Sequence, residues 1–440
     1  MEKVHGKEGS RLAAESHSRA IDRIEEIIKQ EGIDCDFTRL DGYLFAEDPE
    51  GIEELDKELG AAQRAGLTSV QRVDLPLIAN LELTPCLRFP NQAQFHVMKY
   101  LIGLVAAIRK NGGHIFPNTH ADSMVAAKDG ASASIKAAGG YTVSSRSLVV
   151  ATNSPVNDWV EIHTKQAPYR SFVVGLRVAA EVIQRALYWD VEDPYHYVRL
   201  QQEELPEHTE QGLGTPGSSE ILIVGGEDHK TGQEDDGEQR FQRLEAWART
   251  RWPQTAEVVF KWSGQVMESQ DYLGFIGRNP LDKKNVYIAT GDSGMGMTHG
   301  TIAGILISDL LSGKENSWSA LYDPGRIKLR AADEFISENM NAARQYADYL
   351  TGGELKSAEE LSSGEGAVIR RGVKKVAVHR DRDARLRECS AVCPHLGGIV
   401  HWNSTEKTWD CPVHGSRFDP EGRVLNAPAN GGLAQIDGSD

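Results

Sequence analysis

Two short motifs near the C-terminus constrain this chain more than any other feature. They are Cys393-Pro394-His395 and Cys411-Pro412-Val413-His414, and fifteen residues separate them. Each motif supplies one thiolate, from Cys393 or Cys411, and one imidazole, from His395 or His414. The prolines and glycines beside these residues predict tight loops whose backbone N–H groups can closely approach a bound inorganic group. The pattern therefore predicts a metal centre built from two loops.

Two kinds of metal centre use these ligand types. In a 2Fe-2S cluster with mixed ligands, two thiolates bind one iron and two imidazoles bind the other, which makes the protein an electron carrier. In a Cys₂His₂ zinc site, one ion takes all four ligands, usually in the order Cys-Cys and then His-His. The alternating order of this chain favours the iron–sulfur cluster.

Length, charge and cysteine content limit the remaining possibilities. The 440 residues are 40% hydrophobic, which is enough for two or three domains with a substantial core. A formal charge of −16 would repel phosphate backbones and anionic lipid, so we expect no nucleic acid and no membrane partner. Five cysteines are no disulfide framework, and the polar N-terminus is not a secretory leader. These features predict a cytoplasmic protein.

Two predicted strands run into turns of a kind that can bind a cofactor. Residues 148–151 form an apolar run typical of a strand buried on both faces. Residues 285–289 predict a second strand, followed by a glycine-rich turn at 291–296 and a helix over 298–311. Cofactors lie at such turns, and the positive end of the helix would stabilise a negative group. An ordinary strand–helix turn is an equally good interpretation of the spacing alone.

The distribution of elements predicts an α/β (α+β) domain followed by a small all-β domain. We place the first domain at residues 1–326, a helical linker at 327–365 and the small domain at 366–440. Within the first domain, we expect residues 37–46 to form a strand pair that turns at Asp41-Gly42. We expect a helix over residues 92–110.

The C-terminal segment, residues 366–436, resembles the Rieske family. The resemblance implies that Cys393, His395, Cys411 and His414 hold a Rieske 2Fe-2S cluster. Members of the cytochrome bc type carry an extra cysteine in each loop, and those two cysteines form a disulfide; this chain has Gly398 and Val413 there. The family's serine that donates to a sulfide is kept as Ser416, whereas a nearby tyrosine is replaced by Phe418. Cys389 is not needed as a ligand, so we interpret it as a small buried side chain.

The first domain resembles the FAD-dependent glycine, sarcosine and D-amino-acid oxidase superfamily. Residues 285–304 look like its C-terminal flavin-contacting segment, and residues 149–153 look like its inner FAD strand. Segments 188–199, 225–232 and 262–265 are similar to the subgroup in which this domain precedes a Rieske domain. The resemblance implies FAD contacts from Ala151, Thr152, Asn153, Gly291, Ser293, Gly294, Met295, Gly296, Met297 and Thr298.

The same resemblance implies oxidation of a C–N bond in a small amine or amino-acid-like substrate, with electron exchange through the cluster and possible transfer to a redox partner protein. FAD N5 would accept hydride from the substrate carbon. A histidine or tyrosine could take a proton from an ammonium group, and an arginine or lysine could bind a carboxylate. The candidate catalytic residues are His196, Tyr197, His229 and Lys230, with Tyr195, Arg199 and Trp262 nearby in sequence.

Members of this superfamily begin with a strand, a G-x-G-x-x-G turn that binds the FAD pyrophosphate, and an acidic residue that binds the ribose. This sequence contains no such unit, and its first helix matches the segment that follows the unit in the family. We therefore expect the N-terminal dinucleotide-binding βαβ unit to be missing.

Two alternative functions remain open. One is a non-enzymatic electron carrier in which the first domain is only a scaffold. The other is a Rieske oxygenase, but those enzymes place the cluster before a catalytic domain that binds iron through two histidines and one carboxylate. Here the cluster comes last, and the nearest histidine pair, His114 and His120, has no obvious carboxylate partner in sequence.

The loss of the tyrosine donor at Phe418 gives a first prediction. Fewer hydrogen-bond donors stabilise the reduced, more negative cluster less. We expect the reduction potential to lie below that of bc-type Rieske clusters, as measured by redox titration of the cluster signal. A bc-like potential would contradict this inference.

Overall fold

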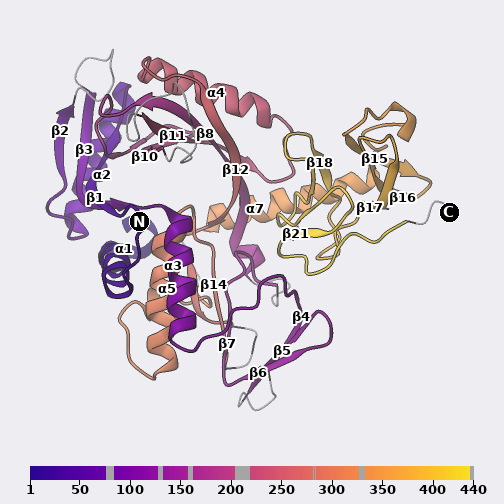
Figure 1. The fold of residues 1–440 in the computed structure, drawn as a ribbon, viewed down its shortest axis with the longest axis horizontal. Coiled ribbons are helices and arrows are strands. Elements are labelled where there is room, and N and C mark those ends of the chain that lie inside the picture. Colours follow the sequence, from indigo (N-terminus) through magenta and orange to yellow (C-terminus); the bar gives the residue numbers. More distant parts are fainter. Residues whose placement is uncertain are drawn as a thin grey trace, which may run out of the picture.

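A large twisted sheet dominates the computed structural model of the protein (Figure 1). The structure describes residues 1–75, 84–126, 132–156, 162–203, 219–280, 282, 284–326 and 332–436. The sheet has eight strands in the order β12-β8-β11-β10-β9-β1-β3-β2. Their bounds are β1 Thr38–Phe45, β2 Gln71–Leu75, β3 Thr84–Gln94, β8 Gln166–Ala179, β9 Leu187–Asp190, β10 His196–Gln202, β11 Ser219–Lys230 and β12 Val258–Ser269.

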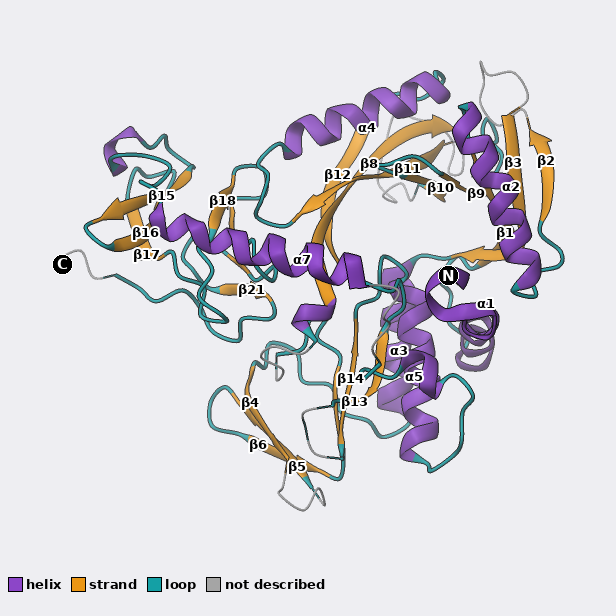
Figure 2. Cartoon of the chain, turned by 180° about the vertical axis from the view of Figure 1, so that it is seen from behind, coloured by secondary structure: helices purple, strands orange, loops and turns teal. Residues whose placement is uncertain are grey.

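Helix α4 (Gly237–Arg251) covers one face of this sheet (Figures 1 and 2). Side chains alternate between the two faces of a strand, so every second residue points toward the helix. The sheet contributes Phe172, Val174, Leu176, Val198, Leu200, Leu222 and Val224 to this core, and α4 and its C-cap contribute Phe241, Leu244, Ala248 and Trp252. Each large apolar side chain buried here stabilises the fold by roughly 1.5–3 kcal/mol. We call the opposite face the inner face.

A smaller sheet and a group of helices lie beside the large sheet. Strand β7 (Leu148–Val150) pairs in parallel with β14 (Val286–Thr290), which pairs with β13 (Phe275–Arg278). Helix α5 (Gly296–Leu311) follows β14 and packs with α1 (Glu2–Glu31) and α6 (Ser319–Tyr322) in one apolar core. Helix α2 (Pro49–Arg64) packs on β1 and β3 of the large sheet, and α3 (Val97–Lys110) packs beside α1. Strands β4 (Ala121–Ala126), β5 (Ala133–Ala137) and β6 (Thr142–Ser145) form a separate antiparallel sheet.

The C-terminal part is built from two small antiparallel sheets. One contains β15 (Gly366–Arg371), β16 (Lys374–Arg380) and β17 (Leu386–Ser390); the other contains β18 (His401–Asn403), β19 (Thr408–Asp410), β20 (Arg417–Phe418) and β21 (Val424–Asn426). Trp402, Trp409 and Phe418 fill the core around the metal motifs. The expected fold class, an α/β domain followed by a small all-β domain, is confirmed.

The segment between the two parts is a structural element in its own right. It contains helix α7 (Ala332–Arg344) and two short 3₁₀ helices, η3 (Gln345–Leu350) and η4 (Ala358–Glu360). Helix α7 extends from the region of α5 to the C-terminal sheets and contacts η1 (His163–Lys165) in the first part (Figure 2). None of the described helices is both long and apolar enough to cross a lipid bilayer.

Two local predictions were wrong. Residues 38–45 form one continuous strand, and Asp41-Gly42 lies at an irregularity where β1 pairs with β3, not at a turn. The predicted helix over 92–110 begins only at Val97, because residues up to Gln94 pair with β1 and the side chain of His96 caps the helix by accepting from the N–H of Lys99. In both places, long-range strand pairing overrides the local pattern.

Gly42 is required by packing, which gives a second prediction. A Cβ atom at this position would lie 2.5 Å from the ring of Trp189 on β9. We expect Gly42→Ala to lower the free energy of unfolding by about 1–3 kcal/mol through overpacking. In the control Gly60→Ala, in α2, the new Cβ meets only the end of the Arg64 side chain. This substitution should raise the free energy of unfolding by roughly 0.5–1 kcal/mol, because alanine is favoured over glycine inside a helix. Urea denaturation measures both, and equal effects would refute the packing argument.

Candidate active site and cluster centre

The two metal motifs form loops of equivalent geometry. In each loop the cysteine N–H donates to the carbonyl five residues later, at 2.8 Å, and the cysteine carbonyl accepts from the N–H four residues later, at 3.0 Å. The residues that donate the second bond, Gly397 and Gly415, have φ of 79° and 77°, a conformation that favours glycine. The sequence therefore builds two matching loops, each with one predicted thiolate and one predicted imidazole ligand.

The four predicted ligands are arranged as two pairs. Cys393 and Cys411 are buried side by side, and the pKa of Cys411 is raised well above its usual value, first by its hydrogen bond with Cys393 and then by burial. The rings of His395 and His414 lie together, with centroids 5.1 Å apart. Two adjacent buried thiols are a suitable donor set for a cation, which would hold both as thiolates.

This arrangement separates the two metal interpretations. A tetrahedral zinc ion would bring four ligand atoms within about 4 Å of one another. Among the described residues, however, Asp190, Glu192 and His196 are the only group of three potential ligands whose atoms lie within 4.8 Å of one another. The four motif residues are too widely spaced for one ion. A pair of thiols beside a pair of imidazoles instead fits a cluster of two irons, because each iron takes one pair.

Burial prepares both imidazoles for metal binding. Together with the neighbouring ring of His163, it lowers the pKa of His395 to about 4 and that of His414 to about 3. A histidine ligand must be neutral to bind metal. Both side chains therefore meet this requirement at neutral pH without paying for deprotonation.

The residues around the loops are closely packed. Gly398 and Val413, which stand where bc-type proteins have cysteines, are in contact: a Cβ on Gly398 would lie 2.5 Å from a methyl carbon of Val413. The hydroxyl of the buried Ser416 accepts from the N–H of Ala429 at 3.0 Å, and Phe418 is fully buried. Cys389 packs in the core, where burial raises the pKa of its thiol to about 12.

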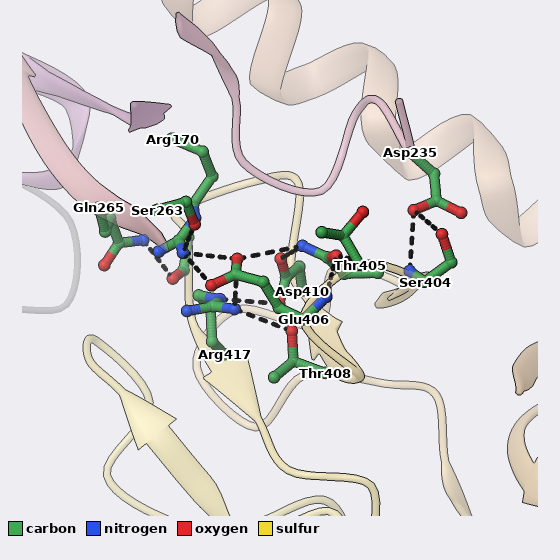
Figure 3. A network of polar contacts seen from close by, with 12 residues as sticks. Arg170, Asp235, Ser263, Gln265, Ser404, Thr405, Glu406, Thr408, Asp410 and Arg417 are labelled. Carbon is green, nitrogen blue, oxygen red and sulfur yellow. Dashed lines mark hydrogen bonds and ion pairs between the residues drawn. The ribbon is translucent and has the colours of Figure 1, made fainter. Parts of the chain in front are cut away.

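A network of ion pairs holds the C-terminal part against the large sheet (Figure 3). Arg170 of β8, whose side chain is almost completely buried, reaches Glu406 at 2.5 Å and also contacts Ser263 of β12. Glu406 in turn binds Arg417 at 2.9 Å, and Arg417 binds Asp410 at 2.9 Å. Removing one partner from such a buried network would leave an uncompensated charge, so the two parts are held in one arrangement.

Further contacts fix the cluster loops themselves. Gln265 of β12 donates to the carbonyl of Gly415 at 2.7 Å. From η3, Tyr346 donates to the carbonyl of Leu396 at 2.8 Å and Tyr349 donates to that of Gly397 at 2.6 Å. The sequence analysis missed these residues, because nothing local marks a tyrosine or glutamine as a partner of a loop far along the chain.

The predicted flavin-contacting turn lies between β14 and α5. Its backbone has positive φ at Gly291 (68°), Ser293 (45°) and Gly294 (75°). A cavity of about 260 Å³ opens beside it, lined by Ala151, Asn153, Ile276, Ala289, Thr290, Gly291, Asp292, Gly296, His299 and Gly300. No other atom lies within 4 Å of a Cβ built on Gly300, so a larger residue there would enter open space. The turn, the glycines and the start of α5 form a cradle that fits a flat, partly anionic ring such as flavin.

The predicted flavin residues are not all equivalent. Ala151, Asn153, Gly291 and Gly296 line this cavity, and Met297 lines an adjoining groove between α1, α3 and α5. Three of the remaining residues make local contacts: Thr152 donates to the Ser154 carbonyl, the Ser293 hydroxyl contacts that of Ser269, and Thr298 contacts His17. The last two are Gly294 and the partly exposed Met295.

Comparison with known proteins agrees with both halves of this geometry. A model of the FAD dependent oxidoreductase family matches residues 4–310, well over half of the chain. The chain belongs to this family. A model of the Rieske [2Fe-2S] domain matches residues 353–437, so FAD and a Rieske 2Fe-2S cluster are the cofactors of this oxidoreductase.

Similar proteins match either the whole chain or one of its two parts. The chain is 28% identical over 438 residues to the putative Rieske 2Fe-2S iron-sulfur protein YhfW of Bacillus subtilis (strain 168), covering 98% of this chain and 81% of that protein. Over 89 residues it is 36% identical to cytochrome b6-f complex iron-sulfur subunit 2 of Synechocystis, covering 19% of this chain and 49% of that protein. In fold it is similar to glycine oxidase from Geobacillus kaustophilus (TM-score 0.57, 18% identity, 72% of this chain and 82% of that chain) and to L-proline dehydrogenase from P. horikoshii (TM-score 0.54, 14% identity, 70% and 81%).

The oxidoreductase does not bring the four candidate catalytic residues together. His196 points toward α4, where it binds Asp190 at 2.8 Å and stacks on Trp247. His229 stacks on Phe172 in the same layer, and burial lowers its pKa to about 4. Lys230 forms an ion pair with Glu338 of α7 at 2.8 Å, beside the cluster.

Tyr197 is the candidate that lies on the inner face, and it has polar neighbours there. Its hydroxyl lies 3.3 Å from that of Ser171, and its ring covers Gly225, where a Cβ would overlap it at 2.1 Å. The Tyr195 hydroxyl donates to Asp228 at 3.2 Å. Strand alternation places Arg199 on the same face as Tyr197, and burial lowers the pKa of this arginine.

Glu268 is the acid–base candidate that the sequence analysis missed. It lies on β12, and the backbone N–H of the next residue, Ser269, donates to the hydroxyl of Ser293 in the predicted flavin turn at 3.0 Å. The pKa of Glu268 is raised to about 7, mainly by burial and also by the charges of Asp228 and Asp292, while a hydrogen bond with Ser293 partly opposes the shift. A carboxyl group with a pKa near neutrality, next to a cofactor turn, is suited to proton transfer.

His114 and His120, the histidine pair considered for an oxygenase iron site, contact other groups. His120 contacts the carbonyl of Asn430 at 3.0 Å, and the ring of His114 lies beside Phe116. The Asp190, Glu192 and His196 group contains a single histidine, already hydrogen-bonded to Asp190.

The contact between Gly398 and Val413 gives a third prediction. A methyl group at position 398 would also lie 3.0 Å from the Cys411 sulfur. We expect Gly398→Ala to reduce the iron content and the Rieske paramagnetic signal by about tenfold, because changes in the residues that surround metal ligands alter metal affinity by about this factor. Gly431→Ala meets no atom within 4 Å and should retain both. Full iron loading of Gly398→Ala would refute the prediction.

Proposed function

We propose that this oxidoreductase oxidises a C–N bond of a small amine or amino-acid-like molecule and exchanges the electrons through its Rieske cluster. The observation that carries the proposal is Glu268, with a pKa near 7, between the flavin turn and the tyrosines of the inner face. Tyr195 extends this link, because its hydroxyl lies 3.9 Å from a Cβ built on Gly294. A substrate on the inner face would therefore contact both an acid–base group and the flavin site.

The charges of the inner face suit an amine. Asp228 and Glu268 present carboxyl groups, and the exposed aromatic rings of Tyr195 and Trp262 lie on the same side of the sheet. Carboxylates and aromatic faces both attract ammonium groups. Arg199 places a cation on this face that is suited to bind a substrate carboxylate.

Each residue has a defined task in this reaction. When bound, FAD supplies the chemistry of hydride acceptance from the carbon next to nitrogen. Glu268 takes the proton from the substrate ammonium, which frees the nitrogen lone pair and allows the C–H bond to weaken. Tyr195 and Tyr197 orient the nitrogen, and Arg199 holds the carboxylate of an amino-acid-like substrate. The N-terminal end of α5, at Gly296, favours negative charge in the cradle.

The flavin contacts remain part of the proposal. We assign the ring contacts to Ala151, Asn153, Gly291 and Gly296, which line the cavity, and keep Thr152, Ser293, Gly294, Met295, Met297 and Thr298 as flanking residues. The fold shared with structures named glycine oxidase and L-proline dehydrogenase supports the reaction class. A redox partner protein would exchange single electrons with the cluster.

The titration of Glu268 gives a fourth prediction. Proton abstraction needs the carboxylate, so kcat/KM for amine oxidation should rise with pH through about 7 as this group loses its proton. Glu268→Gln should lower kcat/KM by roughly 10²–10⁴-fold and remove that pH dependence. The matched control is Glu238→Gln on the exposed side of α4, which should keep the wild-type profile.

The assay uses flavin-loaded protein, a panel of small amines and amino acids, and an artificial electron acceptor. A Glu268→Gln variant with wild-type rate and pH profile would refute the role of Glu268. Protein that binds no flavin and reduces no acceptor with any substrate, but shows the Rieske signal, would instead be an electron carrier.

A further inference from the structure

His163 joins the oxidoreductase domain to the cluster. It lies in η1, immediately before β8, and its side chain is buried with 3% of the residue exposed. Its ring centroid lies 4.7 Å from that of His395 and 5.5 Å from that of His414. One imidazole from the first domain therefore packs against both imidazole ligands from the second.

On its other side, His163 reaches the strand that enters the flavin site. Its Nδ1 lies 3.4 Å from the hydroxyl of Ser154, which is completely buried. Ser154 follows directly after Asn153, a residue of the cavity wall, whose carbonyl accepts a hydrogen bond from Thr290 at the end of β14. The cluster ligands and the flavin cavity are thus connected through the short path His163, Ser154 and Asn153.

His163 also narrows the space around the half-buried His414. The cavity that both residues line holds only about 20 Å³, close to the size of one water molecule. Its other walls include Gln166, Lys230 and Glu338, the last two joined as an ion pair. A smaller side chain at position 163 would enlarge this cavity next to the metal ligands.

We propose that His163 is a positioning residue that seals from water the side of the two imidazoles that faces the first domain, and thereby lowers the reduction potential of the cluster. A Rieske cluster of two ferric ions, two sulfides and two thiolates is neutral when oxidised and gains one negative charge when an electron is added. Because a dry environment disfavours the charged form, the seal holds the potential low. This proposal does not depend on the substrate, so it stands apart from the proposed function.

The test is a redox titration of the full-length, cluster-loaded protein, with dithionite as reductant and the Rieske paramagnetic signal as readout. We expect His163→Ala to shift the midpoint potential to more positive values, because water would enter and stabilise the reduced state. His163→Phe keeps a ring in the space and should stay close to the wild type. His163→Ala should also lose iron to a chelator at least about tenfold faster.

Asp235→Ala provides the matched control. Asp235 accepts two hydrogen bonds from Ser404 across the same boundary between the two parts, both at 2.8 Å, without contacting a ligand. The Asp235→Ala substitution should leave the midpoint potential and the rate of iron loss unchanged. If His163→Ala loses the cluster while His163→Phe loads normally, the result also supports the proposal, because the ring at position 163 then protects the cluster.

Three results would overturn the proposal. They are an unshifted potential in His163→Ala, a shift of the same size in Asp235→Ala, and a His163→Phe variant that behaves like His163→Ala. If neither His163 variant loads a cluster, the ring is needed for assembly and the seal is not its role.

Discussion

The buried charges around Arg170 are the interaction on which the rest of the structure depends. Arg170 stands on the large sheet, and its partner Glu406 belongs to the cluster domain, where Arg417 and Asp410 complete the network. Removing any one of these groups would leave a buried charge uncompensated, which makes a partly separated arrangement costly. The cluster is therefore held in one position, with its histidine ligands turned toward the first domain, where His163 meets them.

The large sheet assigns different tasks to its two faces. The face under α4 is a packed core that also takes up His196 and His229, each with a buried partner. The inner face keeps Tyr197 and Glu268, and it is the side on which polar groups gather near the flavin turn. A strand can support both tasks because consecutive side chains point in opposite directions. The stability of the sheet and the chemistry on it are thus separated residue by residue.

Strand alternation also explains why the four candidate catalytic residues do not lie together. His196 and Tyr197 are neighbours in β10, so they cannot share a face, and this could have been deduced once the strand was recognised. Glu268 was harder to find, because its raised pKa comes from burial and from Asp228 and Asp292, which are distant in sequence. A lone glutamate in a strand carries no local mark of such surroundings.

The sequence by itself determined the two cluster loops with their predicted ligands, the glycine-rich turn before α5 and the two-part architecture, because each depends on residues close together in the chain. Only the tertiary structure decided how the parts meet. It brought His163 onto the ligands His395 and His414, which lie more than two hundred residues further along, and it turned Lys230 toward α7. Such contacts follow from the register of paired strands and from domain docking, which no local pattern encodes.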